Sequence, residues 1–149
     1  MASIETRTQF LGMMMRKDNV FVFGSNLAGI HGAGAAQSAR LYHAAAIGVG
    51  EGRTGYSYGI PTKDHNLEVR SLVDIQASVD RFIEYAEANP RTSFNVTRIG
   101  CGYAGFLDEQ IAPMFNVKHT MFNVYPANCG FDEMWRYYLG VEKHYWGTF

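Results

Sequence analysis

The sequence contains only two cysteines, Cys101 and Cys129, among its 149 residues. Two isolated cysteines fit neither the ligand spacing of a metal site nor the disulfide framework of a small secreted domain. They are typical of small buried apolar side chains in a reducing compartment. We therefore expect no metal ion and no disulfide in this chain.

Clustered positive charge and long apolar runs are also missing. The 13 Lys and Arg residues are balanced by 14 Asp and Glu residues, which gives a formal net charge of −1. Affinity for nucleic acid comes largely from clustered Lys and Arg, so this balance argues against a nucleic-acid partner, except as a modified substrate. No apolar stretch is long enough to span a bilayer, and residues 1–18 lack the pattern of a signal peptide. The sequence predicts a cytoplasmic protein with no membrane partner.

Enough apolar residues are present for one substantial core. Hydrophobic residues make up 47% of the chain, and no linker, repeat or low-complexity tract divides it. We expect a single domain over residues 1–149, with a core over about 18–128 and an aromatic C-terminal extension over 129–149.

Predicted strands and helices alternate along the chain. The apolar run Val20–Phe23 is typical of a strand that is buried on both faces. Three further strands are predicted over residues 56–60, ended by Pro61, over 94–99 and over 121–126. Helices are predicted over 34–46, from the N-cap Ser71 to the Asn89-Pro90 stop, over 107–115 with a break or kink at Pro113, and over 131–138. This order predicts an α/β domain with a mixed, mainly parallel sheet.

Two glycine-rich segments follow predicted strands. GSNLAGIHGAGAA, residues 24–36, follows the first strand and leads into a helix, and GCGYAG, residues 100–105, follows the strand over 94–99. In such sheets ligands lie beyond the carboxyl ends of the strands, where glycine lets backbone N–H groups approach an anion. Neither segment contains a P-loop, and the first lacks the acidic residue that completes a dinucleotide fingerprint. Tight turns without a ligand are the alternative, but the pair favours a clamp for two linked phosphates.

The segments DNVFVFGSNLAGIHGAGAA, YGIPTKD, FNVTRIGCGYAGF and MFNVYPAN, in this order, resemble the ligand loops of macrodomains, the ADP-ribose-binding α/β modules. More closely, they resemble a macrodomain-like group common in phages and bacteria, over about residues 18–128. The resemblance implies a three-layer domain that needs no cofactor, takes ADP-ribose or an ADP-ribosylated substrate, and lies in the host cytoplasm if phage-encoded. The TK and RIGCG segments are most similar to the branch that removes ADP-ribose from acidic side chains.

The resemblance also implies roles for individual residues. Asn26 matches an asparagine that contacts the distal ribose, although it can equally cap the turn. Lys63 matches a lysine that attacks the distal ribose carbon. The phosphate and ribose loops correspond to Gly24, Gly32, Gly34 and Ala35, and to Gly100, Cys101, Gly102, Tyr103, Ala104, Gly105 and Phe106, with Tyr103 or Phe106 placed to pack on a ribose. His31 is a candidate for proton transfer to an attacking water, or a structural hydrogen-bonding residue in the loop.

Two departures from the family pattern leave the activity open. The hydrolytic branch has an acidic residue where this chain has Ala104, and neither Asp64 nor Asp108 stands at the matching place. The acidic residue that contacts adenine also has no secure match, since Asp18 lies only near its position. The sequence therefore predicts nucleotide binding, with hydrolysis of an ADP-ribose linkage as the favoured activity and a non-catalytic binding module as the alternative. A third possibility is a structural protein with an aromatic interface formed by Trp135, Tyr137, Tyr138, Tyr145 and Trp146.

Overall fold

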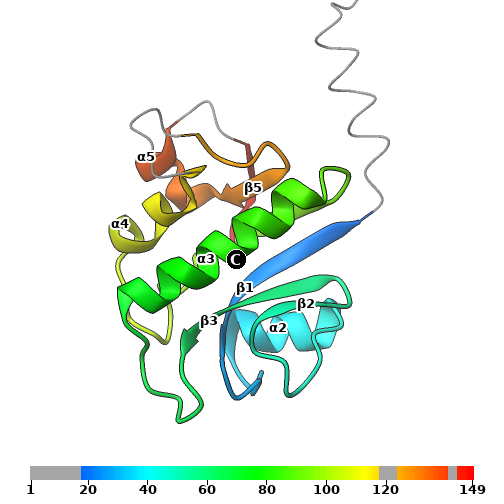
Figure 1. Cartoon of the computed structure of the whole chain (residues 1–149), viewed down its shortest axis with the longest axis vertical. Coiled ribbons are helices and arrows are strands. Elements are labelled where there is room, and N and C mark those ends of the chain that lie inside the picture. Colours follow the sequence, from blue (N-terminus) through cyan, green and yellow to red (C-terminus); the bar gives the residue numbers. More distant parts are fainter. Residues whose placement is uncertain (1–17, 118–123, 141–143) are drawn as a thin grey trace, which may run out of the picture.

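Six strands form one sheet in the order β2-β3-β1-β4-β5-β6 (Figure 1). The computed structural model describes residues 18–117, 124–140 and 144–149. The strands are β1 (Asn19–Asn26), β2 (Gly52–Thr54), β3 (Ser57–Lys63), β4 (Ser93–Val96), β5 (Cys129–Asp132) and β6 (Tyr145–Gly147). Only β2 is antiparallel to its neighbour, whereas the other four pairs are parallel. The predicted α/β fold with a mixed, mainly parallel sheet is confirmed.

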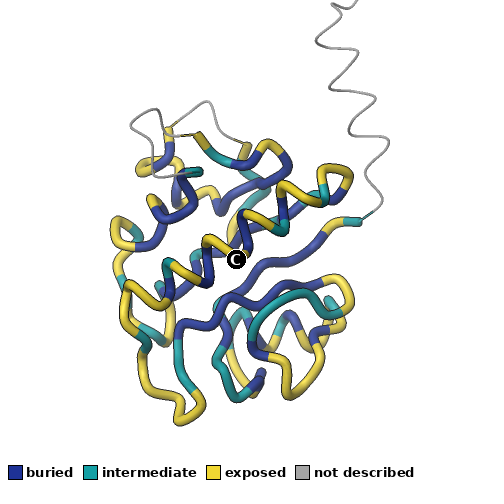
Figure 2. Tube along the Cα trace, viewed as in Figure 1, coloured by how far each residue is buried: buried dark blue, intermediate teal, exposed yellow. Residues whose placement is uncertain are grey.

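Helices cover both faces of this sheet. They are α2 (Gly34–Tyr42), α3 (Leu72–Ala88), α4 (Asp108–Ile111) and α5 (Arg136–Leu139), with the 3-10 turns η1 (Ala112–Phe115) and η3 (Glu133–Trp135). Because side chains alternate along a strand, Val20 and Val22 join the core beneath α3, η1 and η3, while Phe21 and Phe23 join a smaller core beneath α2. Figure 2 shows the buried path of β1 between these helices. The VFVF run is thus buried on both faces, as predicted.

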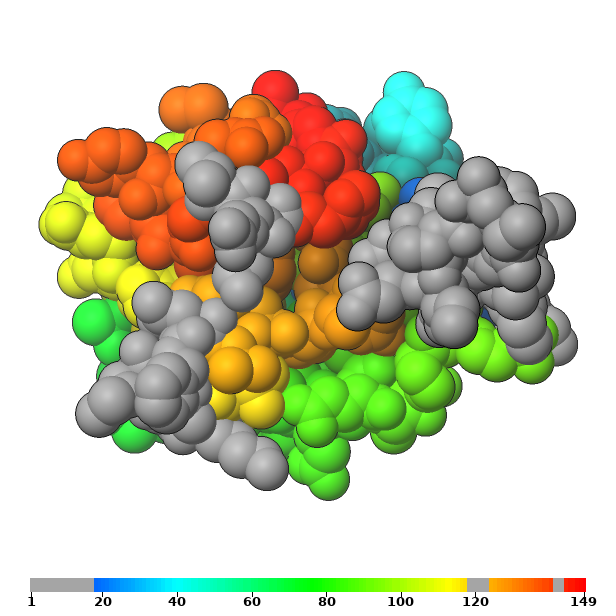
Figure 3. All heavy atoms as spheres, turned by 90° about the horizontal axis from the view of Figure 1, so that it is seen from above, coloured from blue at the N-terminus to red at the C-terminus, as the bar shows by residue number. Residues whose placement is uncertain are grey.

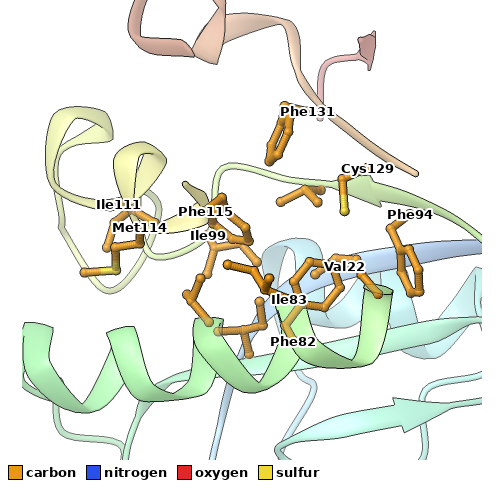
Figure 4. Close-up of a cluster of buried hydrophobic side chains, with 14 of the residues drawn as sticks. Val22, Phe82, Ile83, Phe94, Ile99, Ile111, Met114, Phe115, Cys129 and Phe131 are labelled. Carbon is orange, nitrogen blue, oxygen red and sulfur yellow. The ribbon is translucent and has the colours of Figure 1, made fainter. Parts of the chain in front are cut away.

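The larger core is rich in aromatic rings. Figure 4 shows Phe82 and Ile83 of α3 facing Val22 and Phe94 of the sheet. The Phe82 ring meets the rings of Phe94 and Phe115 edge to face, with centroids 5.3 and 6.0 Å apart. Such pairs add to the free energy gained by burying the rings alone. They fix α3 across the middle of the sheet.

The helix boundaries include two confirmed predictions. The Ser71 hydroxyl accepts a hydrogen bond from the Asp74 backbone N–H at 3.1 Å, which caps α3. The helix over 107–115 changes from α to 3-10 geometry at Ala112, beside Pro113. These ends depend on local chemistry that the sequence displays directly.

Pro61 does not end its strand, contrary to the prediction. Pro61 pairs with Ser25 of β1, and β3 continues to Lys63. Strand β2 pairs with β3 only as far as Gly59, so the nitrogen of Pro61 faces no strand on that side. The Pro61 carbonyl accepts a hydrogen bond from the Arg70 guanidinium at 2.7 Å. Proline is tolerated where no ladder bond is required.

Helix α2 ends four residues earlier than predicted. Ala44 adopts a left-handed conformation, with φ of +57°, and the Ala45 N–H bonds to the Ala39 carbonyl at 3.1 Å. A left-handed residue therefore ends the helix here, as is common at helix C-termini, although it is alanine and not glycine. The glycine-punctuated segment that follows α2 contains β2. The high helix propensity of GAAQSARLYHAAA therefore does not extend the helix past its C-cap, His43.

The C-terminal third departs most from the prediction. The strand predicted over 94–99 ends at Val96, because the chain turns back where the Ile99 N–H bonds to the Thr97 carbonyl at 2.8 Å. The strand predicted over 121–126 falls partly on 121–123, outside the described residues, and residues 124–126 form no strand. The helix predicted over 131–138 begins only at residue 133, since Phe131 pairs with Val96 in the sheet.

Residues 129–149, expected as an extension, contribute β5, β6 and core side chains. Trp135 is fully buried, and Trp146 packs on the α2 side of the sheet, where its indole N–H bonds to the Val96 carbonyl at 2.9 Å. Figure 3 shows the red end of the chain between the orange residues and cyan α2. Among the described residues, no helix is long and apolar enough to cross a membrane.

Candidate functional site

The carboxyl ends of the five parallel strands surround one pocket of about 540 Å³. The last residues of β1, β3 and β5 line it, namely Asn26, Lys63 and Asp132. Residues that follow β4 and β6 also line it, namely Thr97, Arg98 and Phe149. Volumes of several hundred Å³ are typical of small-ligand sites. Four neighbouring strands from β3 to β5 span about 14 Å at the usual strand spacing. The pocket is therefore wide enough for an elongated ligand.

The first glycine-rich loop brings the N-terminus of α2 to this pocket. Residues 32–36 line it, and no side chain caps the helix. The first N–H groups of a helix have no partner within it, so these groups are available to a ligand together with the positive end of the helix dipole. The Asn26 amide donates to the Ile30 carbonyl at 2.7 Å and accepts from the Ile30 N–H at 3.0 Å. Asn26 therefore lines the pocket and also holds its own loop in shape.

The second glycine-rich loop presents backbone N–H groups from the opposite side. The turn is closed by bonds from the Phe106 N–H to the Gly100 carbonyl and from the Gly105 N–H to the Gly102 carbonyl. Within the described part of the chain, the N–H groups of residues 102–104 donate no hydrogen bond. These three residues line the pocket. Unpaired N–H groups in such a turn form a concavity that favours an anion.

The two loops contact each other. The Tyr103 ring lies so close to Gly34 that a Cβ at Gly34 would be only 2.9 Å from it, and Gly34 also has a φ of +57°. At the base of the loops, a Cβ on Gly24 would lie 3.3 Å from the Gly100 nitrogen. Glycine at these positions allows the loops to meet. The site is therefore one continuous surface formed from two distant segments.

At Gly32 and Gly102, no contact within the described protein requires a glycine. Neither lies in the left-handed φ region, and a Cβ on either would meet nothing within 4 Å among the described residues. Both line the pocket, one in each loop. Close approach of a ligand to the backbone is a physical reason for glycine at a position where the protein itself leaves space.

Lys63 lies at an irregularity of the sheet. The register between β1 and β3 shifts after Ser25, so that Asn26 pairs with Lys63 and Thr62 is the additional residue. Bulges of this kind re-aim side chains beside functional sites. Thr62 and Lys63 both line the pocket, and the Lys63 ammonium has no hydrogen bond or ion pair with another described residue. The structure thus brings the predicted Asn26 and Lys63 together.

Three predicted site residues do not line the pocket. His31 is buried, and its Nε2 lies 3.1 and 3.2 Å from the carbonyls of Ala46 and Val49, so it joins two loops as a hydrogen-bond donor. Phe106 packs inward on the main core beside Gly100. Gly105 has a φ of +80° and serves the turn itself. Tyr103, exposed and in the lining, is the aromatic residue at the second loop.

The acidic residues considered as substitutes for the one missing at Ala104 have structural partners. The Asp64 carboxylate accepts from the N–H groups of Asn66 and Glu68 at 2.8 and 3.0 Å. Asp108 pairs with Arg98 through two hydrogen bonds, which hold the pKa of its carboxyl below the usual range. Asp18 pairs with Arg53 just before β1, at the edge of the sheet opposite the pocket. Ala104 itself lines the pocket, whereas Asp108 does not.

Two charged residues of the lining, Arg98 and Asp132, were not predicted from the sequence. Asp132 is fully buried, and its carboxylate accepts from the N–H groups of Met134 and Phe149 and from the Thr148 hydroxyl. Asp132 could have been found as an N-cap residue before Glu133. The predicted helix over 131–138 placed it inside the helix instead. With Lys63, the charged lining has two positive groups against one negative group.

Thiol chemistry is disfavoured at this site. Burial raises the pKa of Cys101, which lies in the second loop, to about 12, so its thiol is protonated at neutral pH. Cys129 is buried in the core, as expected. Among the described residues, no group of three or more His, Cys, Asp or Glu side chains can hold a metal ion.

Comparison of the chain with protein-family models, with curated proteins and with solved structures gives no significant match.

Proposed function

We propose that this chain is a macrodomain-like module that binds ADP-ribose or a related nucleoside diphosphate in the pocket at the strand ends. The observation that carries the proposal is the meeting of two glycine-rich loops, each with available N–H groups, over one pocket. Two facing anion sites match two linked phosphates.

The charge and shape of the lining support the same ligand class. Lys63 and Arg98 outnumber Asp132, so the charged lining favours an anionic ligand. The width across four strand ends allows a sugar on either side of the phosphates. Exposed apolar side chains at both ends, including Ile30, Leu67 and Phe149, offer surfaces for a base or a ribose.

Hydrolysis of an ADP-ribose linkage is a second candidate function, and one observation favours it. The Lys63 amine lines the pocket without a partner among the described residues, next to Asn26. Against it, Ala104 supplies no acid, and Asp64 and Asp108 are held by other groups. Binding without turnover is the function that the site supports best.

Thermal unfolding with ADP-ribose, NAD and AMP tests the proposed binding. Ligand at about 100 times its Kd is expected to stabilise the folded chain by about 2.7 kcal/mol. ADP-ribose should act at the lowest concentration, because it can occupy both loops and both ends of the pocket. Absence of any shift at millimolar concentrations of all three compounds would refute the proposal.

Substituting Gly102 with alanine should weaken ADP-ribose binding at least tenfold and leave the melting temperature nearly unchanged. Beyond its chain neighbours, the added Cβ meets no atom of the described residues within 4 Å and instead occupies space that we assign to the ligand. Titration calorimetry measures the affinity. Gly105→Ala is the matched control in the same loop: its φ of +80° makes it costly for stability by about 1 kcal/mol, yet it does not line the pocket. Normal binding by Gly102→Ala would contradict the placement of phosphate at this loop.

Replacing Lys63 with methionine should abolish any release of ADP-ribose from a modified protein while binding persists. Attack on the distal ribose carbon needs a free amine, which methionine lacks. Lys63→Arg is the control, because it keeps the positive charge without a comparable nucleophile. Full release by both variants would point to an attacking water instead. No release by the unaltered chain would leave the binding module as its function.

A further inference from the structure

Arg98 is held in one orientation by a carboxylate that does not line the pocket. Its Nε and Nη2 donate to the two Asp108 oxygens at 2.9 and 2.7 Å. The Trp135 indole N–H also donates to Asp108 Oδ1 at 2.8 Å, and Trp135 is fully buried in the core. The Asp108 carboxylate therefore links the guanidinium to the rigid interior.

This pairing uses only part of the guanidinium. Arginine has five N–H donors, and the pair with Asp108 occupies one on Nε and one on Nη2. Among the described residues, Nη1 of Arg98 donates no hydrogen bond. About a third of the Arg98 side chain is exposed, with a relative accessibility of 36%. Donors thus remain available on a residue that lines the pocket.

Arg98 stands directly beside the second glycine-rich loop. The Cys101 N–H donates a hydrogen bond to the Arg98 carbonyl at 3.1 Å, so Arg98 leads into the turn. The hydrogen bond to Asp108 raises the pKa of Arg98, so its guanidinium stays charged. Cys101 belongs to the second glycine-rich loop, whose N–H groups at residues 102–104 are available. A positive charge and a row of backbone donors therefore occupy the same end of the pocket.

We propose that Arg98 binds a phosphate group of the ligand together with the second glycine-rich loop, and that Asp108 is the positioning residue that aims its guanidinium. The inference rests on the proposed nucleotide binding and deepens it. It assigns the phosphate contact to the β4–β5 half of the pocket, so the site requires a phosphorylated ligand and a nucleoside alone cannot use this contact.

Because Asp108 holds Arg98 in one orientation, the contact between Arg98 and a phosphate contributes more to the binding free energy. A free arginine loses conformational entropy when it orders around a phosphate, whereas a guanidinium already fixed by two hydrogen bonds loses less. Neutralising Asp108 would keep the positive charge on Arg98, but the guanidinium would no longer be held in one orientation. The two residues therefore have separable effects on binding.

Calorimetric titration with pyrophosphate, AMP, ADP-ribose and adenosine tests this inference. Arg98→Met is expected to lower the affinity for each of the three phosphate compounds at least tenfold and to leave the affinity for adenosine unchanged. Asp108→Asn is expected to lower the affinity for the same three compounds about three- to tenfold. If these residues had only a structural role, the affinity for adenosine would fall as well, or all affinities would stay unchanged.

The chain offers a matched control pair. Arg136 makes the same two-bond pair with Glu133, at 2.7 and 3.1 Å, and neither residue lines the pocket. Arg136→Met and Glu133→Gln should therefore leave every affinity unchanged. Arg98→Lys gives a second test if Arg98→Met does not fold: it keeps the charge, loses the two-bond pair and should bind phosphate compounds with intermediate affinity.

The outcomes separate this inference from the proposed function. Unchanged ADP-ribose affinity in both Arg98 variants would overturn the role of Arg98 while the binding module stands. Pyrophosphate binding that depends on Arg98, without ADP-ribose binding, would support the phosphate site and refute the proposed ligand. If the unaltered chain binds none of the phosphate compounds, both proposals are overturned.

Discussion

Replacing Asp132 with alanine is expected to lower the free energy of unfolding by about 3 kcal/mol, because it leaves several partly buried donors unpaired. The carboxylate is fully buried and accepts hydrogen bonds from Met134 N–H, Thr148 Oγ1 and Phe149 N–H at 2.9, 3.1 and 3.0 Å. These bonds attach residues 148–149 to the end of β5. Urea denaturation measures the change.

The same substitution should also weaken ligand binding, because Phe149 forms part of the pocket wall. Asp132→Asn keeps one acceptor oxygen and should lose less stability than Asp132→Ala. Thr148→Val removes one donor together with its need for a partner, so its cost should be the smallest of the three. A loss below about 1 kcal/mol in Asp132→Ala would show that water replaces the carboxylate, and would contradict its role as an anchor.

Replacing Phe82 with alanine should destabilise the fold by about 3–5 kcal/mol, the usual cost of removing a buried phenyl ring. Phe82 is completely buried and meets the rings of Tyr58, Phe94 and Phe115. Its removal would leave a cavity between α3 and the middle of the sheet. Chemical denaturation at several temperatures would measure this loss.

Val73→Ala on the same helix is the control for Phe82→Ala. Val73 is 78% exposed, so its truncation should change stability by no more than about 0.5 kcal/mol. Helix α3 does not contribute to the pocket lining, so the folded fraction of both variants should bind ADP-ribose normally. A Phe82→Ala variant of normal stability would contradict the packing seen in Figure 4.

The elements that could be predicted from the sequence are those with strong local signals. The VFVF run has only apolar side chains, so its strand can be stable only with both faces covered. Ser71 and the apolar spacing after it determine where α3 begins and which side is buried. Asn26, Lys63 and most residues of the two glycine-rich loops line the pocket, because loops after parallel strands meet at one edge of a sheet.

The predictions that failed concern competition between local preference and tertiary contacts. Phe131 and Asp132 begin an aromatic-rich segment that was predicted as a helix. Phe131 pairs with β4, and both residues pair with β6, so they form the end of a strand. Pro61 is a strand breaker by local rules, but the side of β3 that lacks a ladder partner accommodates it. In both cases the outcome depends on which strands pair, and strand pairing joins residues far apart in the chain that local sequence patterns do not reveal.

The sequence by itself determined the α/β class, the buried first strand, the capped long helix and the places of the two glycine-rich loops, because each depends on neighbouring residues. Only the tertiary structure distinguished among the glycines. A Cβ on Gly50 would lie 2.1 Å from the Asn26 carbonyl oxygen, whereas a Cβ on Gly32 or Gly102 would have no contact within 4 Å in the part of the chain that the structure describes. It also brought Arg98 and Asp132 into the pocket. The physical reason is that strand order and the approach of loops depend on contacts between residues far apart in sequence.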